Sequence, residues 1–149
     1  MIKITFHDTV EDRLLKFAVI VSRYRNQWIF CKHRERSTFE CPGGHREKGE
    51  DIGDAARREL YEETGALEYT LEPVCVYSVK ELDKRRRNSR ESFGMLFYSE
   101  VKKLGELPPA FEMEEIRLFD GIPEDLTYPE ILPVLVAKVM SSVSWRTGE

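Results

Sequence analysis

The sequence predicts an α+β fold, a layered arrangement built on a mixed β-sheet, and two observations carry this prediction. Short apolar stretches rich in β-branched and aromatic residues recur along the chain, which is typical of strands. Two segments with the apolar spacing of helices lie far apart, one in the middle and one near the end. Because strands outnumber helices and do not alternate regularly with them, a layered mixed sheet is favoured over a βαβ repeat.

The predicted strands share one pattern, a few consecutive apolar residues bounded by polar ones. They cover Ile2–Phe6, Phe17–Val21, Trp28–Cys31, Pro73–Val79, Phe93–Val101 and Ile116–Phe119. No internal repeat, low-complexity tract or linker divides them. We therefore expect residues 1–149 to form one domain with one core.

The first predicted helix covers Asp51 to Thr64, where Ile52, Ala56 and Leu60 recur at every fourth position. Asp51 is placed to cap its first turn. Gly65 follows its last residue, where glycine adopts the left-handed conformation that often ends a helix.

The second predicted helix covers Glu130 to Val143, with an apolar side that should pack on the sheet. Pro129 is tolerated before or at the first turn of a helix. Pro133 falls close to the limit of that tolerance, so we expect the start to slip past it.

Composition excludes several functional classes. With 41% hydrophobic and 34% charged residues, the chain resembles a soluble globular protein. Its longest apolar run, Phe17–Val21, is too short to span a bilayer, and acidic residues precede that run where a secretory signal would be basic. We therefore expect a cytoplasmic protein with no membrane partner. The three cysteines lack the spacing of a zinc site or disulfide framework.

A cluster of glutamates in the first predicted helix should destabilise that helix. At about 100° per residue, Glu59, Glu62 and Glu63 share one side, and two of them occupy the last turn, where the helix dipole prefers cations. A solvated charged face is one interpretation. A site is the other, favoured by the glycine-rich loop at Pro42–Gly44. Clustered carboxylates suit Mg²⁺ or Mn²⁺, which bind phosphate oxygens in their remaining positions.

The spacing of the glycines and charged residues from Gly44 to Gly65 resembles the motif of a known protein family. Gly44, Glu50 and the run from Arg58 to Gly65 stand where the Nudix hydrolase family has its Nudix box. Ala66 departs from the bulkier aliphatic residue that the family favours there. The resemblance implies an α/β/α sandwich with a strand-loop-helix catalytic element.

The resemblance also implies roles for the box residues. Arg58 would orient a glutamate through a charge-assisted pair. The implied ligands of Mg²⁺, with Mn²⁺ as the alternative, are the backbone carbonyl of Gly44 and the carboxylates of Glu50, Glu59, Glu62 and Glu63. The general base is left open between Glu62, Glu63 and a loop acid; among Glu112, Glu114 and Glu115 we select Glu114 as the candidate.

The implied reaction is hydrolysis of a nucleoside diphosphate-linked substrate. Beyond the box the chain lacks the proline typical of ADP-ribose hydrolases and the tyrosine typical of dinucleoside polyphosphate hydrolases, and the run from Trp28 to Gly44 is similar to a MutT-type subgroup related to bacterial 8-oxo-dGTP diphosphatases. A (deoxy)nucleoside triphosphate such as 8-oxo-dGTP, cleaved to monophosphate and pyrophosphate, is therefore the leading substrate. The alternatives are an RNA 5′-pyrophosphohydrolase, an ADP-ribose or other nucleotide-sugar pyrophosphatase, and a non-catalytic nucleotide-binding module.

Substrate-binding candidates lie outside the box. Phe39 and Tyr77 are candidates for stacking on a base. Arg86 belongs to the basic tract Lys84–Arg87, which is either a solvated loop or a contact for substrate phosphates or RNA ends. The expected partner is a small nucleotide rather than RNA, and the expected assembly is a monomer or homodimer.

Overall fold

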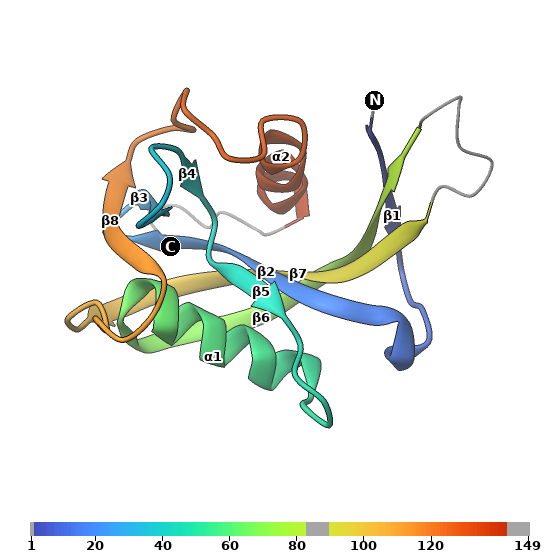
Figure 1. The fold of residues 1–149 in the computed structure, drawn as a ribbon, viewed down its shortest axis with the longest axis horizontal. Helices are drawn as coiled ribbons and strands as arrows, with labels where there is room; N and C mark the ends of the chain where they lie inside the picture. The colour runs from blue at the N-terminus through green and yellow to red at the C-terminus, as the bar shows by residue number, and fades with distance from the viewer. Residues whose placement is uncertain (1, 83–89, 143–149) are drawn as a thin grey trace.

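The computed structural model describes residues 2–82 and 90–142 and arranges them around one mixed β-sheet (Figure 1). The order of the main path is β1-β6-β7-β2-β3-β4, with β5 paired to β2 and β8 paired to β3. Strands β2 and β7 run parallel, whereas the other pairs are antiparallel, so the predicted mixed sheet is confirmed. The strands are β1 (Ile2–His7), β2 (Leu15–Tyr24), β3 (Gln27–His33), β4 (Phe39–Glu40), β5 (Gly43–His45), β6 (Ala66–Glu81), β7 (Glu91–Leu104) and β8 (Met113–Phe119).

The two helices, α1 (Ile52–Thr64) and α2 (Leu132–Ser142), cover opposite faces of the sheet (Figure 1). Alternate residues of a strand point to opposite faces, so Ile20 of β2 packs in the core on the α1 side and Val21 in the core on the α2 side. Each such aliphatic side chain contributes about 1.5–3 kcal/mol when fully buried. The result is the sandwich that the sequence predicted.

Strand β6 is longer than predicted. Its first half has no continuous apolar run, so the sequence pattern did not indicate a strand there. It begins at Ala66, directly after the end of α1, instead of at Pro73. Exposed Glu68 and Thr70 alternate there with half-buried Tyr69 and Leu71, which is the pattern of a strand with one solvated face. The predictions also lacked the short strands β4 and β5.

Local signals fixed both ends of α1. The Asp51 side chain accepts a hydrogen bond from the Gly53 backbone N–H at 2.9 Å, which caps the first turn. Gly65 has a φ of 77° and donates its N–H to the Tyr61 carbonyl, which ends the helix in the left-handed conformation.

The predicted start of α2 was wrong. The helix begins at Leu132 and includes Pro133 in its first turn instead of starting beyond it. A first-turn N–H has no intrahelical acceptor, so proline loses nothing there. Neither helix in the described ranges has the length and apolar composition that crossing a bilayer requires.

Candidate functional site

The candidate site lies where β5 meets α1. Gly43 and Gly44 pair with Val19 and Ala18 of β2, which holds β5 on the sheet beside the helix. A Cβ atom on Gly44 would lie only 2.6 Å from the carboxyl carbon of Glu59. The absence of a side chain at Gly44 therefore lets the Glu59 carboxylate rest directly against the backbone of β5.

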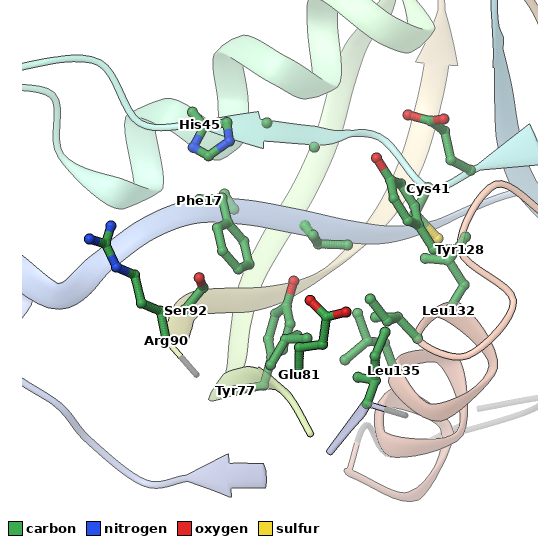
Figure 2. Close-up of a pocket in the computed structure, with 18 residues that line it drawn as sticks. Phe17, Cys41, His45, Tyr77, Glu81, Arg90, Ser92, Tyr128, Leu132 and Leu135 are labelled. Atoms are coloured by element: carbon green, nitrogen blue, oxygen red, sulfur yellow. The ribbon is translucent and has the colours of Figure 1, made fainter. Parts of the chain in front are cut away.

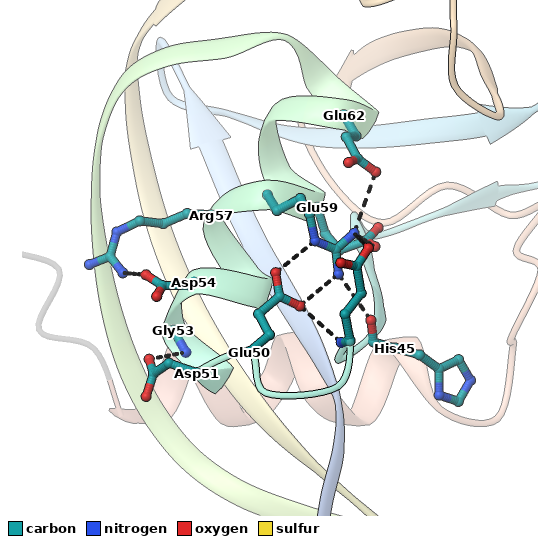
Figure 3. A network of polar contacts seen from close by, with 10 residues as sticks. His45, Glu50, Asp51, Gly53, Asp54, Arg57, Glu59 and Glu62 are labelled. Carbon is teal, nitrogen blue, oxygen red and sulfur yellow. Dashed lines mark hydrogen bonds and ion pairs between the residues drawn. The ribbon is translucent and has the colours of Figure 1, made fainter.

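Arg58 joins the loop to the helix through several short contacts (Figure 3). Its Nε and Nη2 donate to the two carboxylate oxygens of Glu50 at 2.8 and 2.9 Å, and its Nη1 donates to Glu59 at 2.8 Å. Nη1 also lies 3.6 Å from a carboxylate oxygen of Glu62. The hydrogen bonds from Arg58 lower the pKa of Glu50 to about 2. The Arg58 guanidinium thus fixes the positions of Glu50, Glu59 and Glu62 relative to one another.

Glu63 occupies the opposite side of this cluster, where it is shielded from water. Its side chain accepts a hydrogen bond from the Gly43 backbone N–H at 2.8 Å, and its exposed fraction is 7%. Burial, together with the charges of neighbouring acids including Glu59 and Glu112, raises the pKa of Glu63 to about 9, although the hydrogen bond from the Gly43 N–H lowers it. No cationic side chain within residues 2–82 and 90–142 pairs with Glu63. The buried side of the cluster therefore offers carboxyl oxygens that no cationic side chain of the described residues neutralises.

This donor set fits a hard divalent cation. Carboxylate and carbonyl oxygens are the ligands that Mg²⁺ and Mn²⁺ prefer. Burial raises the pKa of Glu59 as well, so two adjacent carboxylates are disfavoured in their charged form unless a positive charge joins them. Within the described ranges, no three acidic, histidine or cysteine side chains already converge on one point. The fit thus rests on the chemistry and burial of the donors.

Of the three acids predicted to lie in a loop, only Glu112 precedes β8, whereas Glu114 and Glu115 belong to that strand. Glu114, the candidate base, pairs with Lys32 at 2.9 Å, and Glu115 pairs with Arg117 at 3.2 Å. Glu112 lies 3.6 Å from His33, and its charge makes a small contribution to the raised pKa of both Glu59 and Glu63. The sequence could not show which of these closely spaced acids lies near the cluster, because this depends on how β8 pairs with β3.

A cavity of about 470 Å³ adjoins the site between the sheet and α2 (Figure 2). It reaches Gly43, Gly44 and His45 at one side, and Phe17, Tyr77 and Leu135 are among the residues of its walls. A cavity of this volume accommodates a small organic ligand. The box and the cavity share β5, so a molecule bound in the cavity can extend a polar group toward the glutamates.

The structure describes two of the three substrate-binding candidates, and these two lie in different places. Tyr77 lines the cavity. Phe39 is instead packed in the core, edge-on to Phe119 at 5.2 Å, and is not among the residues that line this cavity. Arg86 and the tract Lys84–Arg87 lie outside the described residues.

Phe17 lines the cavity although it was not among the residues selected from the sequence. Its ring lies over Gly94 of β7, where a Cβ atom would come within 2.3 Å of the ring, and edge-on to Tyr77 at 5.6 Å. The available signal was Gly94 itself, because a glycine inside a strand often marks the close approach of another group.

The family model of the NUDIX domain matches residues 12–130, a range that contains β5, α1 and β8. The chain belongs to the NUDIX domain family. Nudix hydrolases generally use divalent metals, which agrees with the oxygen donors at β5 and α1.

The Nudix chain is similar to bacterial relatives along nearly its whole length. It is 27% identical to a Bacillus subtilis (strain 168) protein named "Putative 8-oxo-dGTP diphosphatase YtkD", over 95% of this chain and 90% of the relative. Its fold matches the crystal structure of the Bacillus subtilis pyrophosphohydrolase BsRppH (E68A mutant) with a TM-score of 0.77 and 25% identity, covering 97% of this chain and 92% of that one.

A NUDIX hydrolase from Nitrosomonas europaea shares the fold with a TM-score of 0.64 and 18% identity, over 85% of this chain and 89% of that one. Together with the family match, these similarities support a pyrophosphohydrolase enzyme that acts on nucleotide substrates. The predicted family and enzyme class are thereby confirmed.

Proposed function

We propose that this Nudix chain hydrolyses a (deoxy)nucleoside triphosphate such as 8-oxo-dGTP to the monophosphate and pyrophosphate, with Mg²⁺ as its cofactor and Mn²⁺ as the alternative. The observation that carries the proposal is the junction at β5. One side of Gly43–His45 faces buried glutamates, and the other borders a cavity of about 470 Å³ with aromatic walls. A substrate with a nucleoside at one end and phosphates at the other matches this arrangement.

In the proposed site, the cation is held by Glu50, Glu59, Glu62, Glu63 and the carbonyl of Gly44. When bound, it supplies Lewis acidity for a water nucleophile and neutralises phosphate charge. Arg58 positions Glu50 and Glu59 through the hydrogen bonds described above. The donor N–H of Gly43 fixes the orientation of the Glu63 carboxylate. These residues preorganise the donors before substrate arrives.

The proposed base is an acid that takes the proton of the attacking water. The candidates are Glu62, Glu63 and Glu112, and Glu112 replaces Glu114 among the loop acids because Glu114 is engaged by Lys32. The oxygen of water forms a bond to phosphorus while the bridging phosphorus–oxygen bond breaks. The products are a monophosphate, pyrophosphate and a proton accepted by the base.

The direct test measures hydrolysis of nucleoside triphosphates, 8-oxo-dGTP, ADP-ribose and triphosphorylated RNA by the purified chain with Mg²⁺ or Mn²⁺, with identification of the products. The expected result is release of pyrophosphate from a triphosphate. Glu62→Gln should reduce the rate by more than the roughly 10- to 100-fold that loss of an outer-shell partner costs. Glu68→Gln, at an exposed position of β6, is the control. A Glu62→Gln enzyme at the wild-type rate would contradict the proposed metal role.

RNA 5′-pyrophosphohydrolysis is the second candidate, because the basic residue Arg90 lines the cavity and follows the basic tract Lys84–Arg87 closely in the sequence. Cations at that point would attract a polyanion in a salt-dependent manner. Faster release of pyrophosphate from triphosphorylated RNA than from any free triphosphate would favour this candidate. A preference for free triphosphates at all salt concentrations would exclude it.

A further inference from the structure

Strand β6 carries a carboxylate to the cavity beside α2. Tyr77, Val79 and Glu81 are alternate residues of β6, so their side chains leave the same face of the sheet. All three line the cavity, and Figure 2 labels Tyr77 and Glu81 in its wall. No hydrogen bond or ion pair holds this carboxylate within residues 2–82 and 90–142. Glu81 therefore has both oxygens available to a ligand.

Glu40 also borders the cavity, but its carboxylate is directed elsewhere. Its neighbours Phe39 and Cys41 pack in the core on the α2 side, so strand alternation turns Glu40 toward the α1 side. There its carboxylate lies 3.6 Å from Arg36 and raises the pKa of Glu63. Among the described residues that line the cavity, Glu81 is thus the carboxylate positioned for a ligand.

The walls around Glu81 restrict which ligand it can accept. Phe17, Leu132 and Leu135 offer no hydrogen-bonding group, and Arg90 and Ser92 can donate hydrogen bonds elsewhere in the lining. A charged carboxylate accepts hydrogen bonds and donates none. A ligand that places an acceptor against this carboxylate leaves both groups without a partner, and such desolvated groups are costly. The favoured ligand presents neighbouring N–H donors that meet both oxygens.

Common nucleobases differ in whether they present two neighbouring N–H donors. Guanine and its 8-oxo form present a ring N–H beside an amino group, which matches the two oxygens of a carboxylate. Adenine and cytosine place the amino group beside a ring acceptor, and uracil flanks its ring N–H with two carbonyl oxygens. Only the guanine edge offers two adjacent donors.

We propose that Glu81 selects guanine-type bases by accepting hydrogen bonds from their ring N–H and amino group in the cavity beside α2. The inference rests on the proposed nucleotide hydrolysis and adds the base for which that activity is selective. Glu81 is exposed, so a bound base would itself displace water from this carboxylate beside Phe17 and Tyr77, and a desolvated contact discriminates more strongly than a solvated one.

The first experiment measures kcat/KM with Mg²⁺ for GTP, ITP and UTP in the wild-type chain, Glu81→Gln and Glu72→Gln. ITP lacks the amino group of guanine and so removes one donor from the ligand. The expected result is a wild-type preference for GTP and a loss of about 10- to 100-fold on GTP in Glu81→Gln, with a smaller loss on ITP and little on UTP. Glu72→Gln, an exposed carboxylate on the same strand, should keep the wild-type pattern.

The second experiment separates base selection from catalysis by titrating GMP, IMP and UMP into the protein without metal and measuring the heat of binding. Wild type should bind GMP more tightly than IMP or UMP, and Glu81→Gln should lose this order. If no triphosphate is hydrolysed but this order is found, the proposed function fails and the selectivity stands. Equal affinities for GMP and UMP, or an unchanged GTP-to-UTP ratio of kcat/KM in Glu81→Gln, would overturn the selectivity.

Discussion

The backbone N–H of Gly43 donates to the Glu63 carboxylate at 2.8 Å, which ties the strand before the Nudix loop to the last turn of α1. This contact spans 20 residues of sequence and points a buried acid toward the backbone of β5. The proposed cation site and the adjoining cavity therefore depend on how closely β5 approaches the helix.

Gly44→Ala should separate these two elements. The added Cβ would meet the Glu59 carboxyl group at 2.6 Å, so Glu59 must move or β5 must shift. We expect a loss of hydrolytic activity and a fall in unfolding free energy of about 1–3 kcal/mol, measured by urea denaturation. Gly121→Ala is the matched control, since nothing lies within 4 Å of the added atom. Full activity in Gly44→Ala would show that close packing at this position is dispensable.

Arg58→Lys should impair the enzyme although it preserves the charge. Lysine cannot reproduce the paired hydrogen bonds from Nε and Nη2 to Glu50, nor contact Glu59 at the same time. We expect kcat/KM to fall about 10- to 100-fold, with a higher Mg²⁺ concentration needed for half-maximal rate. Arg57→Lys removes a neighbouring arginine whose exposed pair with Asp54 measures 3.6 Å, and it should behave as wild type. Equal effects of the two substitutions would contradict a positioning role.

Divalent cations should stabilise the fold against heat. A cation that binds only the folded state at 100 times its Kd adds about 2.7 kcal/mol. We expect Mg²⁺ or Mn²⁺ to raise the Tm of the wild type and to raise that of Glu63→Gln much less, because the amide is a poorer ligand for a hard cation. Differential scanning calorimetry with and without EDTA measures both shifts. Glu68→Gln should retain the full shift, and an equally large shift in Glu63→Gln would remove that residue from the ligand set.

The two acids Glu112, before β8, and Glu114, within it, should differ in their effect on rate. Glu114 is held by Lys32 at 2.9 Å, whereas Glu112 lies 3.6 Å from His33 and its charge acts on Glu59 and Glu63, so Glu112 is the better placed of the two to assist proton transfer. We expect Glu112→Gln to lower kcat by about 100-fold or more and Glu114→Gln to change it little. Steady-state kinetics at saturating substrate and Mg²⁺ provides the comparison. The reverse order would restore Glu114 as the base.

Phe17→Leu should weaken nucleotide binding more than it slows chemistry. The ring of Phe17 forms part of the cavity wall and contacts Tyr77 at 5.6 Å between ring centres. We expect KM to rise about 10-fold with kcat nearly unchanged, because loss of a stacking surface affects substrate and transition state alike. Phe93→Leu is the control, since Phe93 packs with His7 outside this cavity. A change in kcat alone would argue that Phe17 has no part in binding.

The sequence by itself determined the catalytic element and the helix that carries it. The spacing of Gly44, Glu50 and Arg58–Gly65 is local, and so are the signals of Asp51 and Gly65 that begin and end α1. Helical geometry then places the glutamates on one side without reference to the rest of the fold. The α+β class followed similarly from apolar patterns within each segment.

Only the tertiary structure decided which distant side chains meet this element. Phe39 and Phe17 are both apolar strand residues, and the sequence cannot show that one packs against Phe119 while the other lines the cavity. The same holds for Glu112 and Glu114, whose surroundings depend on the pairing of β8 with β3. Strand register and the packing of two layers are long-range properties, and a shift of one residue turns every side chain to the other face.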